Sequence, residues 1–191
     1  NSGLGGDVGV SPVIAPEAMI STSHPLASQV GIDILKSGGN AVDAAIAACA
    51  TLCVIEPAMT GIGGDCFALY VPNGATKPIA MNGSGRAPKA ASVEKLRDRG
   101  IKTIEVQSPH AVTIPGAISA WIKLNDDHGT KGMDELLAPA IRYADNGFPI
   151  AHRVGTDWLG LVPKLMADAV SSKVMTVGGK APVIGSTFCQ P

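Results

Sequence analysis

Aromatic and charged side chains are scarce in this sequence. Aromatic residues make up 4% of its 191 residues and charged residues 16%, against 46% hydrophobic residues. The net charge of −1 offers no attraction to nucleic acid or to an anionic membrane surface. With 23 glycines and 14 prolines, the composition predicts a globular chain with many sharp turns and a sizeable core of small aliphatic side chains.

Long apolar runs are also missing. No stretch reaches about eighteen consecutive apolar residues, which is the length that a helix needs to cross a bilayer. The first residues do not show a basic region followed by a hydrophobic one, the pattern of a secretion signal. We therefore expect a soluble chain without a membrane span. Its compartment stays open between the cytoplasm and the periplasm or the exterior.

The sequence lacks clusters of metal ligands. Cys49 and Cys53 lie one helical turn apart in an apolar segment, and Cys66 and Cys189 stand alone, so the four cysteines do not have zinc-like spacing. The histidines are scattered at His24, His110, His128 and His152. We expect buried, unreactive thiols, no metal site and no cofactor.

The segment 37–88 organises the rest of the prediction. Asn40 can cap a helix through its side-chain oxygen, and Asp43 places a carboxylate in the first turn of that helix. The helix is expected from Ala41 to Ile55. Its residues are nearly all apolar, so we expect it to be buried on every side.

A glycine turn and a β-hairpin follow this helix. Gly61, Gly63 and Gly64 predict a tight turn with positive backbone angles. The hairpin is expected to pair a strand at Cys66–Val71 with one at Lys77–Asn82. Because the glycines follow a helix and open a strand, no helix N-terminus is expected to face them, and we expect a steric role rather than phosphate binding.

The remaining periodicity predicts mainly helices. His24 precedes the first of them and is expected to order its initial turn rather than to act as a catalytic base. Asn1–Ser11 is expected to be poorly ordered because it is rich in glycine. Strands are expected at Val13–Thr22 and around Thr103–Val106. Helices are expected at 25–36, 91–99, 117–127 and 133–145 and, in two pieces, within 150–174.

Several motifs together resemble those of a known family. They are Ser23–Ser28, Gly38–Ala45, Glu56–Pro57, Gly61–Gly64 and Arg86–Pro88, with fainter likeness at Pro115–Gly116 and Leu137–Ile141. In this order the motifs resemble the gamma-glutamyltranspeptidase family of N-terminal-nucleophile hydrolases, over most of the chain.

This resemblance implies an α+β fold, in which two central antiparallel sheets lie between helical layers in an αββα sandwich. This portion would be largely helical with a β-hairpin. In that family a proenzyme cleaves itself, and the N-terminal threonine of the small subunit is the nucleophile, its own amine accepting the hydroxyl proton. Since the chain begins with Asn1, residues 1–191 are expected to be the N-terminal portion of a large subunit, with no catalytic residue. The expected partner is the missing small subunit.

Three residues are candidates for substrate binding. Arg86 follows a glycine-bracketed loop after the hairpin, and its guanidinium suits a substrate carboxylate. The alternatives are a surface arginine or one paired with a structural acid. Alignment on Ala87-Pro88 places the family's carboxylate-binding arginine at Ser84 instead of Arg86. Ser84 and Asn82 are expected to make secondary polar contacts.

The resemblance implies cleavage of an amide bond in a small carboxylate-bearing substrate, with transfer of the acyl group to water or an amine. Because Ser84 departs from the family's pattern, a related amidohydrolase or acylase acting on a small amide without a gamma-glutamyl group is an alternative. A noncatalytic binding or structural module is an alternative of a different class.

Overall fold

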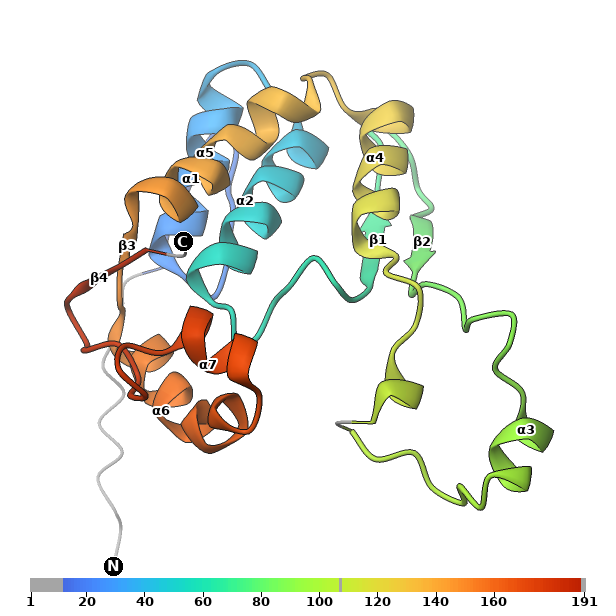
Figure 1. The fold of residues 1–191 in the computed structure, drawn as a ribbon. Helices are drawn as coiled ribbons and strands as arrows, with labels where there is room; N and C mark the ends of the chain where they lie inside the picture. The colour runs from blue at the N-terminus through green and yellow to red at the C-terminus, as the bar shows by residue number, and fades with distance from the viewer. Residues whose placement is uncertain (1–11, 107, 190–191) are drawn as a thin grey trace, which may run out of the picture.

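The computed structural model describes residues 12–106 and 108–189. It shows a helical body to which a hairpin, a long arm and a C-terminal unit are attached (Figure 1). The predicted α+β class is confirmed, because helices dominate and the longest strands form one antiparallel hairpin. The expected disorder of Asn1–Ser11 lies outside the described residues. No helix of the described part is long and apolar enough to cross a bilayer.

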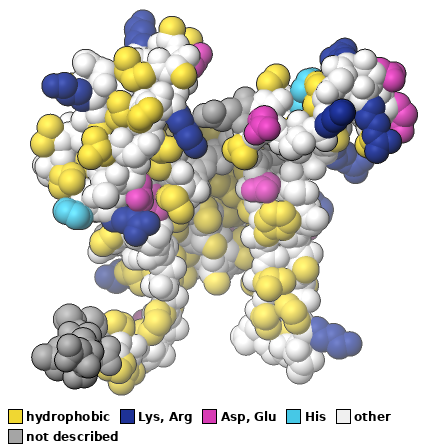
Figure 2. Space-filling view, turned by 90° about the horizontal axis from the view of Figure 1, so that it is seen from below, with side chains coloured by type: hydrophobic (Ala, Val, Ile, Leu, Met, Phe, Trp, Pro, Cys, Tyr) yellow, Lys and Arg dark blue, Asp and Glu magenta, His cyan; other side chains and the backbone are white. Residues whose placement is uncertain are grey.

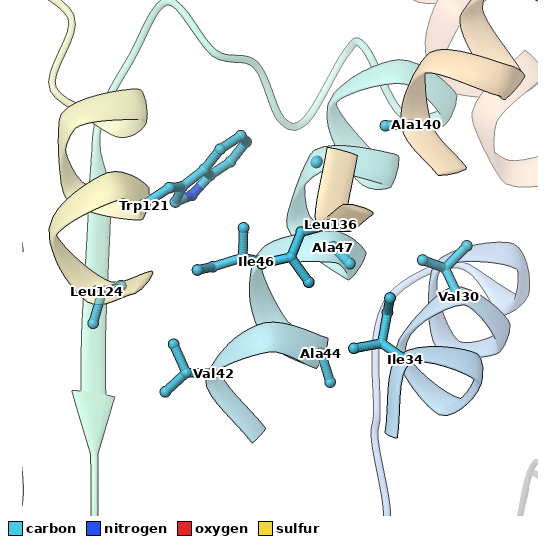
Figure 3. Close-up of a cluster of buried hydrophobic side chains, with 11 residues drawn as sticks. Val30, Ile34, Val42, Ala44, Ile46, Ala47, Trp121, Leu124, Leu136 and Ala140 are labelled. Carbon is cyan, nitrogen blue, oxygen red and sulfur yellow. The ribbon is translucent and has the colours of Figure 1, made fainter. Parts of the chain in front are cut away.

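Helix α2 (Ala41–Ile55) is the centre of the helical body, with the predicted bounds. It packs against α1 (Pro25–Lys36) and α5 (Met133–Asn146), and less extensively against α4 (Ala117–His128). Figure 3 shows the apolar side chains that meet there, with Trp121 of α4 directed toward α2. The members of this core are Val30, Ile34, Val42, Ala44, Ile46, Ala47, Ala50, Trp121, Leu124, Leu136 and Ala140.

The first turn of α2 is held by a buried polar cluster. The Asn40 side chain accepts hydrogen bonds from the amides of Val42 and Asp43, and the Asp43 carboxylate accepts one from the Asn40 amide. Asp43 also accepts from the Thr130 hydroxyl at 2.5 Å and from the amides of Thr130 and Lys131. The predicted cap is confirmed, and the same carboxylate fixes the turn between α4 and α5.

Burial of α2 is incomplete, so the prediction of a helix covered on every side is wrong. Ile46 is 2% exposed, whereas its neighbour Ala45 is exposed. The apolar composition was a sound reason to expect burial, but no described element of this chain covers the face that carries Ala45.

The beginning of α1 lies beside the end of α2. His24 caps α1 by accepting a hydrogen bond from the Leu26 amide at its Nδ1 atom, which confirms its predicted role. The Ser23 hydroxyl donates to the Glu56 carboxylate at 2.5 Å. These contacts join the two helices at one end.

Strands β1 (Cys66–Tyr70) and β2 (Ile79–Gly83) form the predicted hairpin, with Cys66 opposite Gly83. β1 ends one residue earlier than expected, and β2 is shifted toward the C-terminus. Helix α4 packs on the hairpin, while Phe67 and Leu69 are 63% and 78% exposed. The sheet therefore has a covered side and a bare side.

An arm formed by residues 87–113 leads from β2 to α4 (Figure 1). It carries α3 (Val93–Asp98) and a 3-10 turn at Pro109–Ala111. The strands predicted at Val13–Thr22 and Thr103–Val106 do not form. Both segments have apolar residues, but a strand also requires a hydrogen-bonding neighbour, and the described chain supplies none to either segment.

The C-terminal unit contains the two helices predicted within 150–174, α6 (His152–Met166) and α7 (Ala169–Met175). A short antiparallel pair of β3 (Phe148–Pro149) and β4 (Thr187–Phe188) closes it. Trp158 is 1% exposed and donates its indole N–H to the Met175 carbonyl, and it belongs to a second core that this unit shares with α1 and α2.

Candidate substrate-binding site

The three candidate residues lie together at the end of β2. Asn82, Ser84 and Arg86 line an open hollow of about 490 Å³. The opposite wall is formed by the segment before α4 and by its first turn, which contribute Ile114, Pro115, Gly116 and Ser119. The structure thus brings together the residues that the sequence placed in one loop, and adds a second wall.

Asn82 has a more structural position than expected. Its side-chain oxygen accepts a hydrogen bond from the Ser84 amide at 3.0 Å, which folds the chain into a tight turn after the strand. The Thr113 hydroxyl lies 3.4 Å from the Ser84 carbonyl oxygen, to which it donates. The Ile114 amide donates to the Arg86 carbonyl at 2.9 Å. The backbone of the loop is therefore fixed while its side chains face the hollow.

Two glycines let the walls of the hollow approach closely. Gly85 has a φ of 75°, and a Cβ atom there would lie 2.0 Å from the Ile114 carbonyl oxygen. A Cβ atom on Gly116 would lie 2.2 Å from the Gly83 carbonyl oxygen. Any larger residue at either position would push the walls apart.

The Gly61–Gly64 turn adjoins this site, contrary to one sequence prediction. The Gly64 carbonyl accepts hydrogen bonds from the amides of Gly116 and Ala117, so the N-terminus of α4 does face the glycine turn. The predicted positive backbone angles are also wrong, because Gly61, Gly63 and Gly64 have none. A Cβ atom on Gly61 or Gly63 would meet nothing within 4 Å, so the steric role expected for them has no origin in the described residues.

Among the described residues, Arg86 supplies the only ionised side chain that lines the hollow, beside the hydroxyls of Ser84 and Ser119. Its guanidinium is exposed, and within the described part of the chain it has no ion-pair partner. The alternative of pairing with a structural acid is thus not seen among these residues. The geometry suits a ligand that carries a carboxylate.

The hollow can bind but cannot perform acid–base chemistry by itself. No His, Asp, Glu, Lys or Cys side chain of the described part of the chain lines it. Over residues 12–106 and 108–189, no group of three or more His, Cys, Asp or Glu side chains is placed to hold a metal ion. The structure offers a positioned cation and hydroxyls, without a nucleophile and base pair.

Three of the four thiols are also unsuited to nucleophilic or acid–base chemistry. Burial raises the pKa of Cys53 to about 11, aided by the nearby Cys49, and burial also raises the pKa values of Cys49 and Cys66. These three thiols are half-buried and protonated at neutral pH, in line with the prediction of unreactive thiols. Cys189 is exposed, so the prediction of burial is wrong for that residue.

Sequence reasoning missed the second wall of the site. The sequence marks Pro115–Gly116 as one of the fainter family motifs, just before a predicted helix, but gives no sign that it faces the loop after β2, and Thr113 and Ser119 give no signal of their own. The spacing of Ser119, three residues after Gly116, places it one helical turn into α4 on the side of the hollow. Its relevance follows only from the hollow that it lines together with residues 82–86, and that of Thr113 from its hydrogen bond to the Ser84 carbonyl, 29 positions earlier.

Comparison with known proteins identifies the family of this chain. The model of the gamma-glutamyltranspeptidase family matches residues 27–191. The chain belongs to this family. It is 36% identical over 93% of its length to the glutathione hydrolase-like YwrD proenzyme of Bacillus subtilis (strain 168), covering 34% of that protein. It is 34% identical to the oxamate amidohydrolase proenzyme of Klebsiella pneumoniae, again covering 93% of this chain and 34% of the relative.

A solved member of the gamma-glutamyltranspeptidase family shares the fold. The crystal structure of the Helicobacter pylori gamma-glutamyltranspeptidase superposes with a TM-score of 0.86 at 29% identity, covering 94% of this chain and 52% of that chain. The likeness found in the sequence motifs is therefore confirmed, and the matched region is the N-terminal part of the large subunit. This chain spans about a third of the length of the two curated relatives.

Proposed function

We propose that residues 1–191 are the N-terminal portion of a large subunit, and that this portion binds the substrate of an amide-cleaving enzyme. The enzyme would open the amide bond of a small carboxylate-bearing substrate and pass the acyl group to water or to an amine. The observation that carries this proposal is the hollow in which the unpaired Arg86 is the only ionised lining group. Family membership supplies the reaction class.

The nucleophile is proposed to be the N-terminal threonine of a separate small subunit. Its hydroxyl oxygen would attack the amide carbonyl carbon while its own α-amine takes the hydroxyl proton, and the amine product would leave with a proton. Water or an acceptor amine would then attack the resulting ester and release the threonine. Arg86, with Ser84 and Asn82 beside it, would hold the substrate carboxylate through these steps.

The lengths of the matched regions support processing into two chains. The matched region makes up 52% of the solved Helicobacter pylori chain, but 34% of each of the two proenzymes named above. The solved chain is therefore shorter than a proenzyme. Mass spectrometry of the freshly made full-length protein tests this part, because a second polypeptide beginning with Thr is expected. A single uncut polypeptide that retains its biological role would favour the noncatalytic module.

A second candidate is an amidohydrolase for a small acid amide that has no gamma-glutamyl group. It is favoured by Ser84, which occupies the position where alignment on Ala87-Pro88 expects the family's arginine. The Klebsiella relative is named as an oxamate amidohydrolase, and oxamate is a small acid amide of this kind. The two candidates share the role of Arg86 and differ in how far the carboxylate lies from the scissile amide.

Arg86→Ala in the complete enzyme tests the binding role. The preferred substrate is first chosen between a gamma-glutamyl anilide and oxamate. We expect the substitution to raise the Michaelis constant and to lower kcat/KM by about ten- to a hundredfold, the equivalent of roughly 1.5–3 kcal/mol for a charge-assisted hydrogen-bonded pair. Arg86→Lys should recover little, because lysine loses the planar pair of donors.

Two controls separate binding from folding. A substrate that lacks the carboxylate, such as a gamma-aminobutyryl anilide for the first candidate, should be turned over by wild type and variant at similar rates. Lys89→Ala removes an exposed cation three residues away that does not line the hollow, and should leave kcat/KM nearly unchanged. Equal losses on both substrates would make Arg86 a structural residue and would contradict the proposal.

A further inference from the structure

A second hollow lies on the arm, away from the substrate-binding site. It has a volume of about 220 Å³ and is formed by one side of α3 and by the 3-10 turn at Pro109–Ala111. Lys95, Arg99 and His110 line it, and no Asp or Glu side chain does. Its apolar lining includes Leu96, Pro109 and Val112. The hollow thus combines cationic donors with a small apolar floor.

The two cationic groups of the hollow lie close together along the chain. Lys95 belongs to α3 and Arg99 caps its C-terminal end four positions later, so both side chains can face the hollow from the same side. Asp98 is within reach of Lys95 by spacing. Nevertheless, no ion pair or side-chain hydrogen bond of Lys95 or Arg99 occurs in the described part of the arm. Both cationic groups are available to an anion from solution.

The arm has two legs, one that carries α3 and one that carries His110, and they meet around this hollow. Few hydrogen bonds join the two legs. At the base of the arm, the Ile114 amide bonds to the Arg86 carbonyl. Above that point, among the described residues, no backbone hydrogen bond joins the leg that carries α3 to the leg that carries His110. An anion that contacted Lys95 and Arg99 on one leg and His110 on the other would connect them.

We propose that this hollow is a binding site for a compact organic anion, with one carboxylate or phosphate group on a small apolar body. The anionic group would contact Lys95 and Arg99, with His110 on the opposite side, and the apolar body would lie on Leu96 and Pro109. Figure 2 shows Lys and Arg side chains on the lobe at the upper right, where the arm projects, with Asp and Glu side chains on the same lobe. This inference does not rest on the amide-cleaving function.

The test measures binding of two simple anions to the full-length protein. Benzoate and phenyl phosphate are titrated and followed by ligand-observed NMR, with benzyl alcohol as the uncharged probe of the same shape. The site variant combines Lys95→Gln with Arg99→Gln. The matched control combines Arg97→Gln with Lys102→Gln, which removes the same charge from arm residues that line a different hollow. Circular dichroism checks that both variants remain folded.

We expect saturable binding of at least one anion, weakened about tenfold or more in the site variant and by less than about twofold in the control. Binding of benzoate alone would identify a carboxylate ligand, and binding of phenyl phosphate alone a phosphate ligand. Benzyl alcohol should bind much more weakly than either. The proposal is overturned if both variants weaken binding equally, because this would indicate general attraction to a basic surface, or if neither anion saturates.

Discussion

The start of α2 and the end of β2 use their polar residues in opposite ways. At the start of α2, both side-chain polar atoms of Asn40 and both carboxylate oxygens of Asp43 have hydrogen-bond partners within the chain. At the end of β2, the Ser84 hydroxyl and the Arg86 guanidinium have none among the described residues, although the backbone that carries them is fixed. Satisfied polar groups hold a fold, whereas unsatisfied groups on a rigid support are available to a ligand.

The glycines repeat this difference. Gly85 and Gly116 are required by close approach inside the chain, while Gly61 and Gly63 face open space with ordinary backbone angles. The second pair lies between the hairpin and the apolar groove that Trp121 and Ile141 help to line. No contact of the described residues therefore accounts for glycine at positions 61 and 63. Substitution can test whether each glycine is required by contacts within the chain or by something outside it.

The largest effect is expected within α2 itself. Ile46→Asp would bury an unpaired carboxylate at a site that is 2% exposed, which is expected to cost several kcal/mol and to prevent folding. The neighbouring Ala45→Asp should be tolerated in the 191-residue chain because Ala45 is exposed. Circular dichroism and urea unfolding of both variants provide the measurement. Equal loss of structure would show that both faces of α2 are covered.

The next effect concerns the carboxylate that joins α2 to the turn before α5. Asp43→Ala would remove a buried carboxylate and leave the amides of Thr130 and Lys131 without their acceptor, and should lower the free energy of unfolding by about 3 kcal/mol. Asp33→Ala is the matched control, since the exposed Asp33 carboxylate only accepts from Gln29 and should matter by less than about 0.5 kcal/mol. Similar losses in the two variants would contradict a special role of Asp43.

The same carboxylate has a predictable pH dependence. Burial raises the pKa of Asp43, but hydrogen bonds from Thr130, Asn40 and Lys131 outweigh burial and lower it below the ordinary value. A lowered pKa in the folded state contributes stability above the unfolded pKa of about 3.9, and this contribution disappears as the pH falls through the folded pKa. Wild type should therefore lose more stability than Asp43→Ala when the pH is lowered from 5 toward 2.

These two regions also explain what the sequence could reveal. The α2 cap was predictable because Asn40 and Asp43 act on amides within three residues, and local spacing determines such contacts. The bond from Asp43 to Thr130 was not, because it spans 87 positions and depends on how α4 and α5 pack. Likewise the sequence makes Arg86 a candidate from its loop, whereas the place of Ser119 in the same hollow depends on the docking of α4 on the hairpin.

The strand errors have a similar origin. Cys66–Tyr70 was predicted as a strand and forms one, because its partner lies just beyond a short turn. Val13–Thr22 also contains apolar residues, but it is interrupted by Pro16 and has no strand beside it in the described chain. An apolar pattern indicates a tendency to be buried, whereas a sheet also requires a neighbouring strand. The relatives named above are about three times as long as this chain.

A smaller effect should distinguish the two kinds of glycine. Gly85→Ala would place a Cβ atom against the Ile114 carbonyl at a positive φ, and is expected to destabilise the chain by about 2 kcal/mol. Gly63→Ala should change the stability of the 191-residue chain by less than about 0.5 kcal/mol, because nothing lies within 4 Å. Urea unfolding measures both.

Repeating the Gly63→Ala substitution in the full-length protein tests whether something outside the described residues requires this glycine. If Gly63 is required by something outside the described residues, then Gly63→Ala should lower the yield of mature protein or its stability there, although it is neutral in the short chain. Neutral behaviour in both contexts would show that the glycine turn has no external neighbour. A destabilised short chain would contradict the open space around Gly63.

The smallest effect tests an exception inside the well-satisfied region. His24 is 5% exposed, and its Nδ1 atom caps α1, but its Nε2 atom has no hydrogen-bond partner among the described residues. Burial lowers the pKa of His24, and the nearby Glu56 only partly opposes this.

Below the unfolded pKa of about 6.5, the unfolded chain therefore binds a proton at His24 more readily than the folded chain does. The stability of the folded chain consequently falls as the pH falls from 7.5 to 5. His24→Asn keeps a capping oxygen and removes the titration, so it should lose less stability than wild type over this range. His152→Asn removes an exposed histidine and should follow wild type. If all three proteins lose stability equally, the acid sensitivity arises elsewhere, and the unpartnered Nε2 atom carries no energetic consequence.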